Sequence, residues 1–406
     1  MPFHAYGPSV DDEALLDALR QGHDRSREPG EPFWRVPSSF LWSALYCGGR
    51  LTPATVGGVR YLVRTIGEPG FGGDDPALRQ AAVWFLRDVA GVALAGVDRA
   101  AASRRDEPEV RQWLAAYLRG PRSVLEWTEA DAPGEVLLAA ARVDCFDLLP
   151  EVFAAIEPML AASEPRLRIS AASAAAMLSR HPDLVAHQPR LLAYHLAECV
   201  SDDPHHRASM LLGAGELDGA PREWLSDPHP GVRVCAALAP ALADDSEATA
   251  VLLGEATKNP AVIDMQAFEG MVLTVLPHAA AVLAERLCRA IDDVDRLLPA
   301  AIASVPYGAT YLDVGEEHQM QAALCEPYLR MVFPDGLPSA ATPAQRRLAA
   351  ALAQHDPAWG RDFRTLAPPD RYRASRDAQA WEATFSRLRL PNDRSSWLAV
   401  AQADPA

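Results

Sequence analysis

Apolar residues along much of this 406-residue chain recur at the spacing of an α-helix. In the segment 147–162 they fall at i, i+3, i+4, i+7, i+10 and i+11, which is one face of a helix: Leu149, Val152, Phe153, Ile156, Met159 and Leu160. The segments 187–200, 247–257 and 278–291 have similar patterns. Runs typical of β-strands are few, so the pattern predicts an all-α protein.

A short motif recurs before the helical segments: an acidic residue, a proline, two further residues and an arginine. It starts at Asp75, Glu107, Glu164 and Asp203, and a variant with two extra residues runs from Asp227 to Arg233. An acidic N-cap accepts hydrogen bonds from free backbone N–H groups, and proline loses none at the first helical position. Each motif therefore predicts a helix start. We also expect its arginine to form a salt bridge with the acidic cap of its own or a neighbouring unit.

Helices rich in small residues follow several of these starts, as in residues 169–178 and 234–239. The run from Asp227 through Val232 and Arg233 to Leu238 resembles the first helix of a HEAT repeat, and the runs that start at Glu164 and Asp203 are similar. The resemblance implies a right-handed α-solenoid of HEAT-like helix pairs with atypical capping segments. It says almost nothing about chemistry.

Four segments follow from this interpretation. Residues 1–69 contain a cluster of aromatic side chains and are expected to form an N-terminal helical cap, because a terminal repeat must cover its outer face. Residues 70–304 form the repeat array. Residues 305–342 are rich in proline and glycine and are expected to be an irregular insertion, and residues 343–406 a C-terminal helical cap.

Composition and charge limit the classes of molecule that the chain is expected to bind. The formal net charge is -16, which disfavours nucleic acid as a ligand and suits a basic protein or peptide. The single lysine among 38 basic residues is typical of a GC-rich bacterial gene. Six widely spaced cysteines, with Cys235 and Cys288 in apolar helical patterns, indicate buried, reduced thiols. With no signal peptide and no run of 18 apolar residues, we expect a cytoplasmic protein without a membrane span.

Catalytic motifs are missing from the sequence: it contains no GxSxG, HExxH, P-loop or EF-hand signature, so no catalytic residue, cofactor or metal ligand is assigned. Six of the eleven histidines fall between His181 and His229, and His195, Glu198 and Asp202 share one helical face. These residues are interpreted as ordinary polar positions of helices. A divalent metal site is the alternative.

Two groups of residues are predicted to contact a partner. One is Tyr194, His195 and Glu198 on a second helix of the array, and the other lies in the segment 306–318: Tyr307, Tyr311, Asp313, Glu317 and His318. The predicted function is binding of a protein or peptide on the concave face, as scaffold, adaptor or inhibitor. The alternative is an enzyme or lyase-like protein on a HEAT-type scaffold, because some families similar in fold act on chromophores or alkylated DNA bases. A metal-dependent hydrolase is a third possibility.

Overall fold

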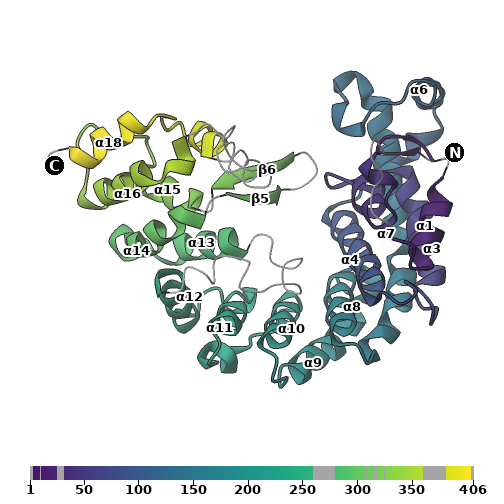
Figure 1. Ribbon diagram of the computed structural model, residues 1–406, viewed down its shortest axis with the longest axis horizontal. Coiled ribbons are helices and arrows are strands. Elements are labelled where there is room, and N and C mark those ends of the chain that lie inside the picture. The colour runs from purple at the N-terminus through teal and green to yellow at the C-terminus, as the bar shows by residue number, and fades with distance from the viewer. Residues whose placement is uncertain are drawn as a thin grey trace. The chain divides into compact units, whose positions relative to one another are not determined.

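The computed structural model describes residues 3–9, 11–24, 32–258, 279–307, 309–314, 318–323, 325–359 and 381–403. Within these ranges the chain is mostly α-helical, as the apolar spacing predicts (Figure 1). Short strands form three two-stranded sheets: β1 (Phe3–His4) with β2 (Gly7–Pro8), β3 (Tyr46–Cys47) with β4 (Arg50–Leu51), and β5 (Ala309–Val314) with β6 (His318–Ala323). The first two pairs are antiparallel.

The contacts divide the chain into two compact units. Unit 1 comprises most of the residues up to Ala197, and unit 2 most of the residues from Glu198 onward. This boundary falls inside the segment 70–304 that the sequence assigns to one array. The predicted segment ends at residues 69, 304 and 342 stay predictions.

Unit 1 is built from helices joined by short 3-10 turns. The α-helices are α1 (Asp12–Arg20), α2 (Pro37–Phe40), α3 (Pro53–Thr65), α4 (Pro76–Ala95), α5 (Arg99–Ser103), α6 (Pro108–Tyr117), α7 (Ala132–Ile156), α8 (Pro165–Leu178) and α9 (Gln188–Glu198), with α9 ending at the boundary. The 3-10 turns are η1 (Phe33–Arg35), η3 (Arg104–Asp106), η4 (Val124–Glu126), η5 (Glu129–Asp131), η6 (Glu157–Ala161) and η7 (Pro182–His187), and η2 (Leu41–Leu45) is a π-helix. The helix predicted from the segment 147–162 is thus the end of the much longer α7.

Small side chains make the core of unit 1 tight. Helix α4 packs against α7 and α8, and α3 packs against α7. The facing part of α8 is fully buried and consists largely of alanine, with Ala171, Ala172, Ala174, Ala175 and Ala176 at 0% exposure. Such small side chains let the backbones of neighbouring helices approach closely.

Aromatic residues near the N-terminus pack inside unit 1. Phe40 is fully buried, and Trp42 meets Phe85 of α4 edge to face with ring centroids 6.0 Å apart. Trp34 stacks on Tyr6 at 5.9 Å. These rings cover apolar surface of their own unit, which is what a terminal cap requires.

Unit 2 continues with shorter helices. They are α10 (Pro204–Glu216), η8 (Arg222–Ser226), α11 (Pro230–Ala237), η9 (Pro240–Leu242), α12 (Ser246–Lys258), α13 (Ala279–Ala290), α14 (Val294–Ser304), η12 (Val305–Tyr307), α15 (Glu326–Val332), α16 (Pro343–Gln354), η14 (Asp356–Trp359), a helix over 381–387, and α18 (Arg394–Gln402). Contacts follow chain order, from α10 to α11, α12, α14, α16 and α18 in turn. Near the C-terminus, Trp381 and Trp397 are fully buried around Phe385.

The segment 305–342, predicted to be irregular, contains regular elements where the structure describes it. Strand β5 carries Thr310, Tyr311 and Val314, residue types that favour strands, and pairs with β6. Helix α15 follows and packs against α13 and α14. Proline and glycine content alone therefore does not reveal these paired strands.

Candidate functional site

All four regular motifs begin helices as predicted, and in three of them the acidic side chain accepts a hydrogen bond from the first turn. The Asp75 carboxylate accepts from the Ala77 N–H at 2.9 Å, that of Asp203 from the His205 N–H at 2.9 Å, and that of Glu164 from the N–H groups of Arg166 and Leu167. The exception occupies the cap position of α6 without bonding the helix: Glu107 pairs instead with Arg104.

In the variant motif the cap itself differs from the prediction. His229 is the N-cap of α11, and Asp227 lies two residues before it, where its carboxylate accepts from the His229 N–H at 2.8 Å. The two extra residues between Asp227 and Arg233 therefore move the helix start forward, and the aspartate stabilises the turn that precedes it.

In three of the five motifs the arginine also donates to backbone carbonyls just before the helix, which the sequence does not predict. Arg168 donates to the carbonyls of residues 162 and 163, at 2.8 and 3.2 Å. Arg207 donates to those of residues 201 and 202, at 2.7 and 3.1 Å, and Arg233 to those of residues 227 and 228, at 2.6 and 3.1 Å. In each case the acceptors are the two residues before the N-cap. The guanidinium thus ties each helix to the chain entering it.

The same contact occurs at a start that the acidic motif misses. Thr342 caps α16, followed by Pro343, and Arg346 donates to the carbonyl of Ala341 at 3.0 Å. Threonine caps helices by the same chemistry as aspartate. A motif defined as Asp, Glu or Thr before proline would have included this start.

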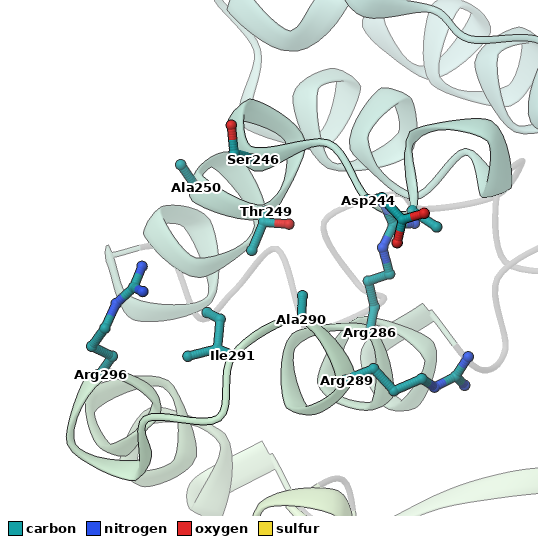
Figure 2. Close-up of a pocket in the computed structure, with 10 residues that line it drawn as sticks. Asp244, Ser246, Thr249, Ala250, Arg286, Arg289, Ala290, Ile291 and Arg296 are labelled. Atoms are coloured by element: carbon teal, nitrogen blue, oxygen red, sulfur yellow. The ribbon is translucent and has the colours of Figure 1, made fainter.

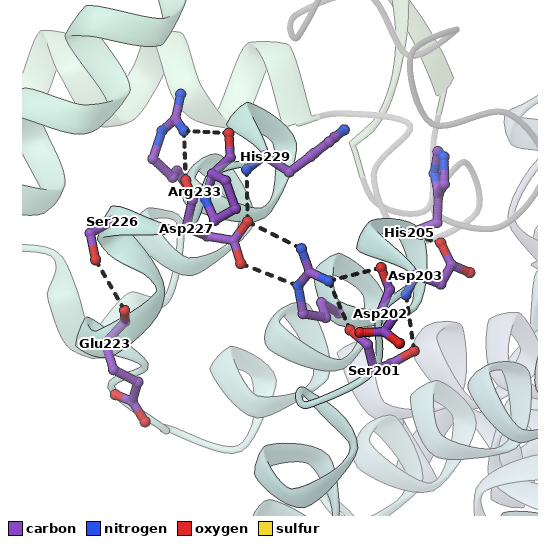
Figure 3. Close-up of polar contacts among 11 residues, drawn as sticks. Ser201, Asp202, Asp203, His205, Glu223, Ser226, Asp227, His229 and Arg233 are labelled. Carbon is purple, nitrogen blue, oxygen red and sulfur yellow. Dashed lines mark hydrogen bonds and ion pairs between the residues drawn. The ribbon is translucent and has the colours of Figure 1, made fainter.

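Two of these arginines also pair with a carboxylate of a neighbouring element. Arg207 holds Asp227 through two contacts, Nε to Oδ2 and Nη2 to Oδ1, both at 3.2 Å (Figure 3). Arg233 Nε lies 3.0 Å from Glu255 Oε1 in the last turn of α12. We call Arg207, Asp227, Arg233 and Glu255 the arginine ladder. The exposed fractions of these side chains are 14%, 9%, 22% and 12%. The predicted salt bridge to the acidic residue of the next motif is therefore confirmed for Arg207, whereas Arg233 pairs with a glutamate that caps no helix.

The three residues predicted to contact a partner on α9 make polar contacts inside the fold. Tyr194 donates to the carbonyl of Leu160 at 2.9 Å. His195 is only 1% exposed, with its Nε2 3.3 Å from the carbonyl oxygen of Ala172. In unit 2, a Glu198 carboxylate oxygen lies 3.1 Å from His206 Nε2. Tyr194 and Glu198 remain partly exposed, so their role at a contact surface stays a prediction.

The second predicted group is described in its backbone alone, or not at all. Glu317 is not described, and for Tyr307, Tyr311, Asp313 and His318 only the backbone is, in η12, β5 and β6. The side chains of these residues lie outside the described part of the structure, so their proposed contacts stay predictions.

The histidine cluster does not assemble a metal site in the described ranges, where no group of three or more His, Cys, Asp or Glu side chains is placed to hold a metal ion. The closest pair, His205 and His229, have ring centroids 6.4 Å apart at the starts of α10 and α11. Burial, followed by the neighbouring His205, lowers the pKa of His229.

All six cysteines are free. Cys235 is fully buried as predicted, whereas Cys288 is only partly buried, because it lies on α13 beside the exposed Arg289. Burial raises the pKa of the Cys288 thiol to about 11. Burial is the first cause of a raised pKa at each of the other five thiols as well.

A cavity of about 600 Å³ in unit 2 is lined by several arginines (Figure 2). We call it the arginine cavity. It lies between the start of α12 and the adjoining ends of α13 and α14, and its lining residues are Ala243, Asp244, Ser246, Thr249, Ala250, Arg286, Arg289, Ala290, Ile291 and Arg296. Three arginines against one aspartate make the lining net positive.

The three arginines differ in what holds them. Arg286 is half-buried and donates to the carbonyls of Ala239, at 3.3 Å, and Leu242. Burial lowers its pKa, and the nearby Asp244 opposes that effect. Arg289 and Arg296 are exposed, and no ion pair joins either to another described residue.

The arginine cavity was only partly predictable from the sequence. Arg286 and Arg289 are three residues apart and therefore share a helical face. Arg296 comes from the next helix, and the hydroxyls come from α12. Only the fold brings these residues together.

A larger cavity of about 900 Å³ in unit 1 has a mixed lining that includes Trp127, Asp98 and Arg142. Its Arg50 is already satisfied, by Glu135 at 3.2 Å and by the carbonyl of Val124 at 3.0 Å. The charges of that cavity are largely matched within the protein, in contrast to the arginine cavity.

No family model, curated protein or solved structure matches this chain. The class that the described residues define is a mostly helical protein with proline-started, acid-capped helices. In the part searched, no single helix has the length and hydropathy to cross a membrane, although the bent pair Pro76–Ala95 and Arg99–Asp106 meets that composition jointly.

Proposed function

We propose that the chain is a HEAT-like α-solenoid that binds a protein or peptide partner, as scaffold, adaptor or inhibitor. The observation that carries this proposal is the arginine ladder of unit 2. It connects the starts of α10 and α11 to α12, in chain order, through Arg207, Asp227, Arg233 and Glu255. Repeat proteins are held together by such contacts between consecutive units.

The order of helix contacts supports the same proposal. Within unit 2, each of α10, α11, α12, α14, α16 and α18 contacts the next in that series. A stack of this kind has no single central core, and it presents rows of equivalent helices as an extended surface. Extended surfaces suit macromolecular partners better than small substrates.

The charge of the chain indicates the kind of partner. A formal net charge of -16 at pH 7 attracts a basic protein or peptide and accelerates its association. We propose that Tyr194 of unit 1, Glu198 of unit 2 and residues of the segment 306–318 each contact the partner. A cytoplasmic location is part of this proposal.

Two experiments test the architecture and the function separately. Small-angle scattering should give a radius of gyration clearly above about 22 Å, the value for a compact chain of this length. A smaller radius would contradict the solenoid and leave partner binding to be tested on its own.

For the function, the purified chain is used to capture a partner from a native bacterial lysate at low salt. The expected result is a stoichiometric complex whose Kd rises with ionic strength, with hydrogen-exchange protection on α9 and around 306–318. Turnover of a small molecule that Tyr311→Phe or His318→Gln abolishes, without any stable complex, would instead support the enzyme alternative.

A further inference from the structure

We infer that the arginine cavity binds a small organic anion, a molecule with an apolar body and one carboxylate or phosphate group. This site goes beyond partner binding and does not depend on it, because its lining belongs entirely to unit 2 and includes none of the residues proposed to contact a partner. Three features of the cavity support the inference: unmatched charge, fixed geometry and a mixed polar and apolar wall.

The charge of the cavity is unmatched although the chain has an excess of carboxylates. Several other arginines of unit 2 meet acidic partners: Arg222 with Asp245, Arg330 with Glu285 and Arg387 with Glu326. Arg289 and Arg296 have no such partner among the described residues, and the one acidic residue of the lining, Asp244, lies beside Arg286. An anion entering the cavity therefore meets positive charge that the protein itself does not neutralise.

The geometry makes Arg296 the principal contact. Arg286 and Arg296 extend toward the α12 side from opposite ends of the cavity, whereas Arg289 points away from Thr249 (Figure 2). Because Arg286 already donates to the carbonyls of Ala239 and Leu242, it forms a fixed positive wall. The guanidinium of Arg296 is free to bind an incoming oxyanion through two parallel N–H donors.

The wall of the cavity indicates an organic ligand and not a bare ion. Apolar contacts come from Ile291 and from alanines on both sides, and the hydroxyls of Ser246 and Thr249 add donors of adjustable direction. A volume of about 600 Å³ lies in the range of small-molecule sites. Both carboxylates and phosphates match the guanidinium fork, so the shared chemistry is a planar or tetrahedral oxyanion on an apolar body.

The test uses isothermal titration calorimetry on the purified full chain at low salt. The probes are benzoate, phenyl phosphate, inorganic phosphate and the uncharged benzyl alcohol. We expect benzoate or phenyl phosphate to bind, inorganic phosphate to bind more weakly, and benzyl alcohol not to bind. Which of the two organic anions binds more tightly distinguishes a carboxylate site from a phosphate site.

The variant Arg296→Gln should raise the Kd of the bound probe at least about tenfold, as expected for the loss of a charge-assisted contact. Arg296→Lys keeps the charge but loses the fork, so its Kd should fall between those of Arg296→Gln and the unmodified chain. The matched control is Arg347→Gln, which removes the same charge from an exposed position on α16 outside the cavity.

Arg296 forms no hydrogen bond or ion pair with another described residue, so its replacement should leave the melting temperature unchanged. Thermal melts of all variants check this. Equal weakening by Arg296→Gln and Arg347→Gln would show that only net charge matters, and it would overturn the proposal. Failure of every anion to bind the unmodified chain at millimolar concentration would do the same.

Discussion

Replacing Arg207 by methionine removes the guanidinium that joins the starts of α10 and α11. The side chain carries two kinds of contact: carbonyls at 2.7 and 3.1 Å in the chain entering α10, and the Asp227 carboxylate at 3.2 Å twice. The side chains of the ion pair are only 14% and 9% exposed. Loss of one partner leaves a mostly buried carboxylate and two carbonyls without their donor.

The expected cost follows from this burial. Breaking a buried pair by removing one partner costs about 3 kcal/mol or more, because the remaining charge stays desolvated. The matched control is Arg330→Met in the same unit. Its partner Glu285 lies closer, at 2.6 Å, but the two side chains are 54% and 35% exposed. An exposed pair contributes about 1 kcal/mol or less, so burial should outweigh distance.

Urea unfolding followed by circular dichroism measures both variants, with Asp227→Asn and the double variant completing a thermodynamic cycle. We expect a coupling energy of about 1 to 3 kcal/mol between Arg207 and Asp227. Because the chain forms two units, their unfolding transitions are fitted separately where they resolve. A coupling below about 0.5 kcal/mol, or an equal cost for Arg330→Met, would refute a stabilising role for the ladder.

Three further predictions concern unit 1 and use thermal or urea unfolding. Glu164→Ala should cost about 1 kcal/mol through loss of the cap of α8, whereas Glu107→Ala should cost much less because its carboxylate bonds no helix N–H. Gly134→Ala should destabilise the fold by about 1 to 3 kcal/mol, because the added Cβ would lie 2.5 and 2.7 Å from two tryptophan rings. Gly91→Ala, within α4 where an added Cβ has no neighbour within 4 Å, should stabilise it by about 0.5 to 1 kcal/mol. Burial, and after it the charge of a nearby arginine, lowers the pKa of His4 from 6.5 to about 4. The contribution of neutral His4 to the free energy of unfolding is therefore complete above pH 6.5 and is lost as the pH falls toward 4. A His4→Gln variant whose stability has the same pH profile as the unmodified chain would contradict this.

Local capping chemistry explains why the helix starts were predictable. The bonds from Glu164 to the N–H groups of residues 166 and 167 span only a few residues, so they can be inferred from the order of side chains. The same reasoning failed at His229 and missed Thr342, because the motif was defined by acidic caps alone. A definition that admits threonine would have found the start at Thr342, but not the one at His229, whose side chain does not cap the helix.

Contacts distant in sequence were harder to predict. The sequence indicated that Arg207 would bond a neighbouring unit, but the two carbonyls that it also binds are visible only once the turn before α10 is folded. His195 illustrates the opposite error: it shares a helical face with Glu198, yet it is 1% exposed. Periodicity places residues on one face without saying whether another helix covers that face.

The same residue type therefore has two roles in unit 2, and the surroundings decide between them. At the helix starts, a proline turn exposes two carbonyls one turn below the arginine, and Arg207 and Arg233 satisfy them while reaching a carboxylate of the next element. Arg296 also lies in the first turn of its helix, but it is three residues after the N-cap Asp293 where Arg207 is four after Asp203, and no proline follows its cap. Asp293 caps that helix through the N–H of residue 295. Among the described residues Arg296 has no hydrogen-bond or ion-pair partner, so its guanidinium stays available to the cavity. A proline inserted between Asp293 and Val294 would restore the motif spacing, and it should reduce anion binding by turning the arginine toward the carbonyls before its own helix.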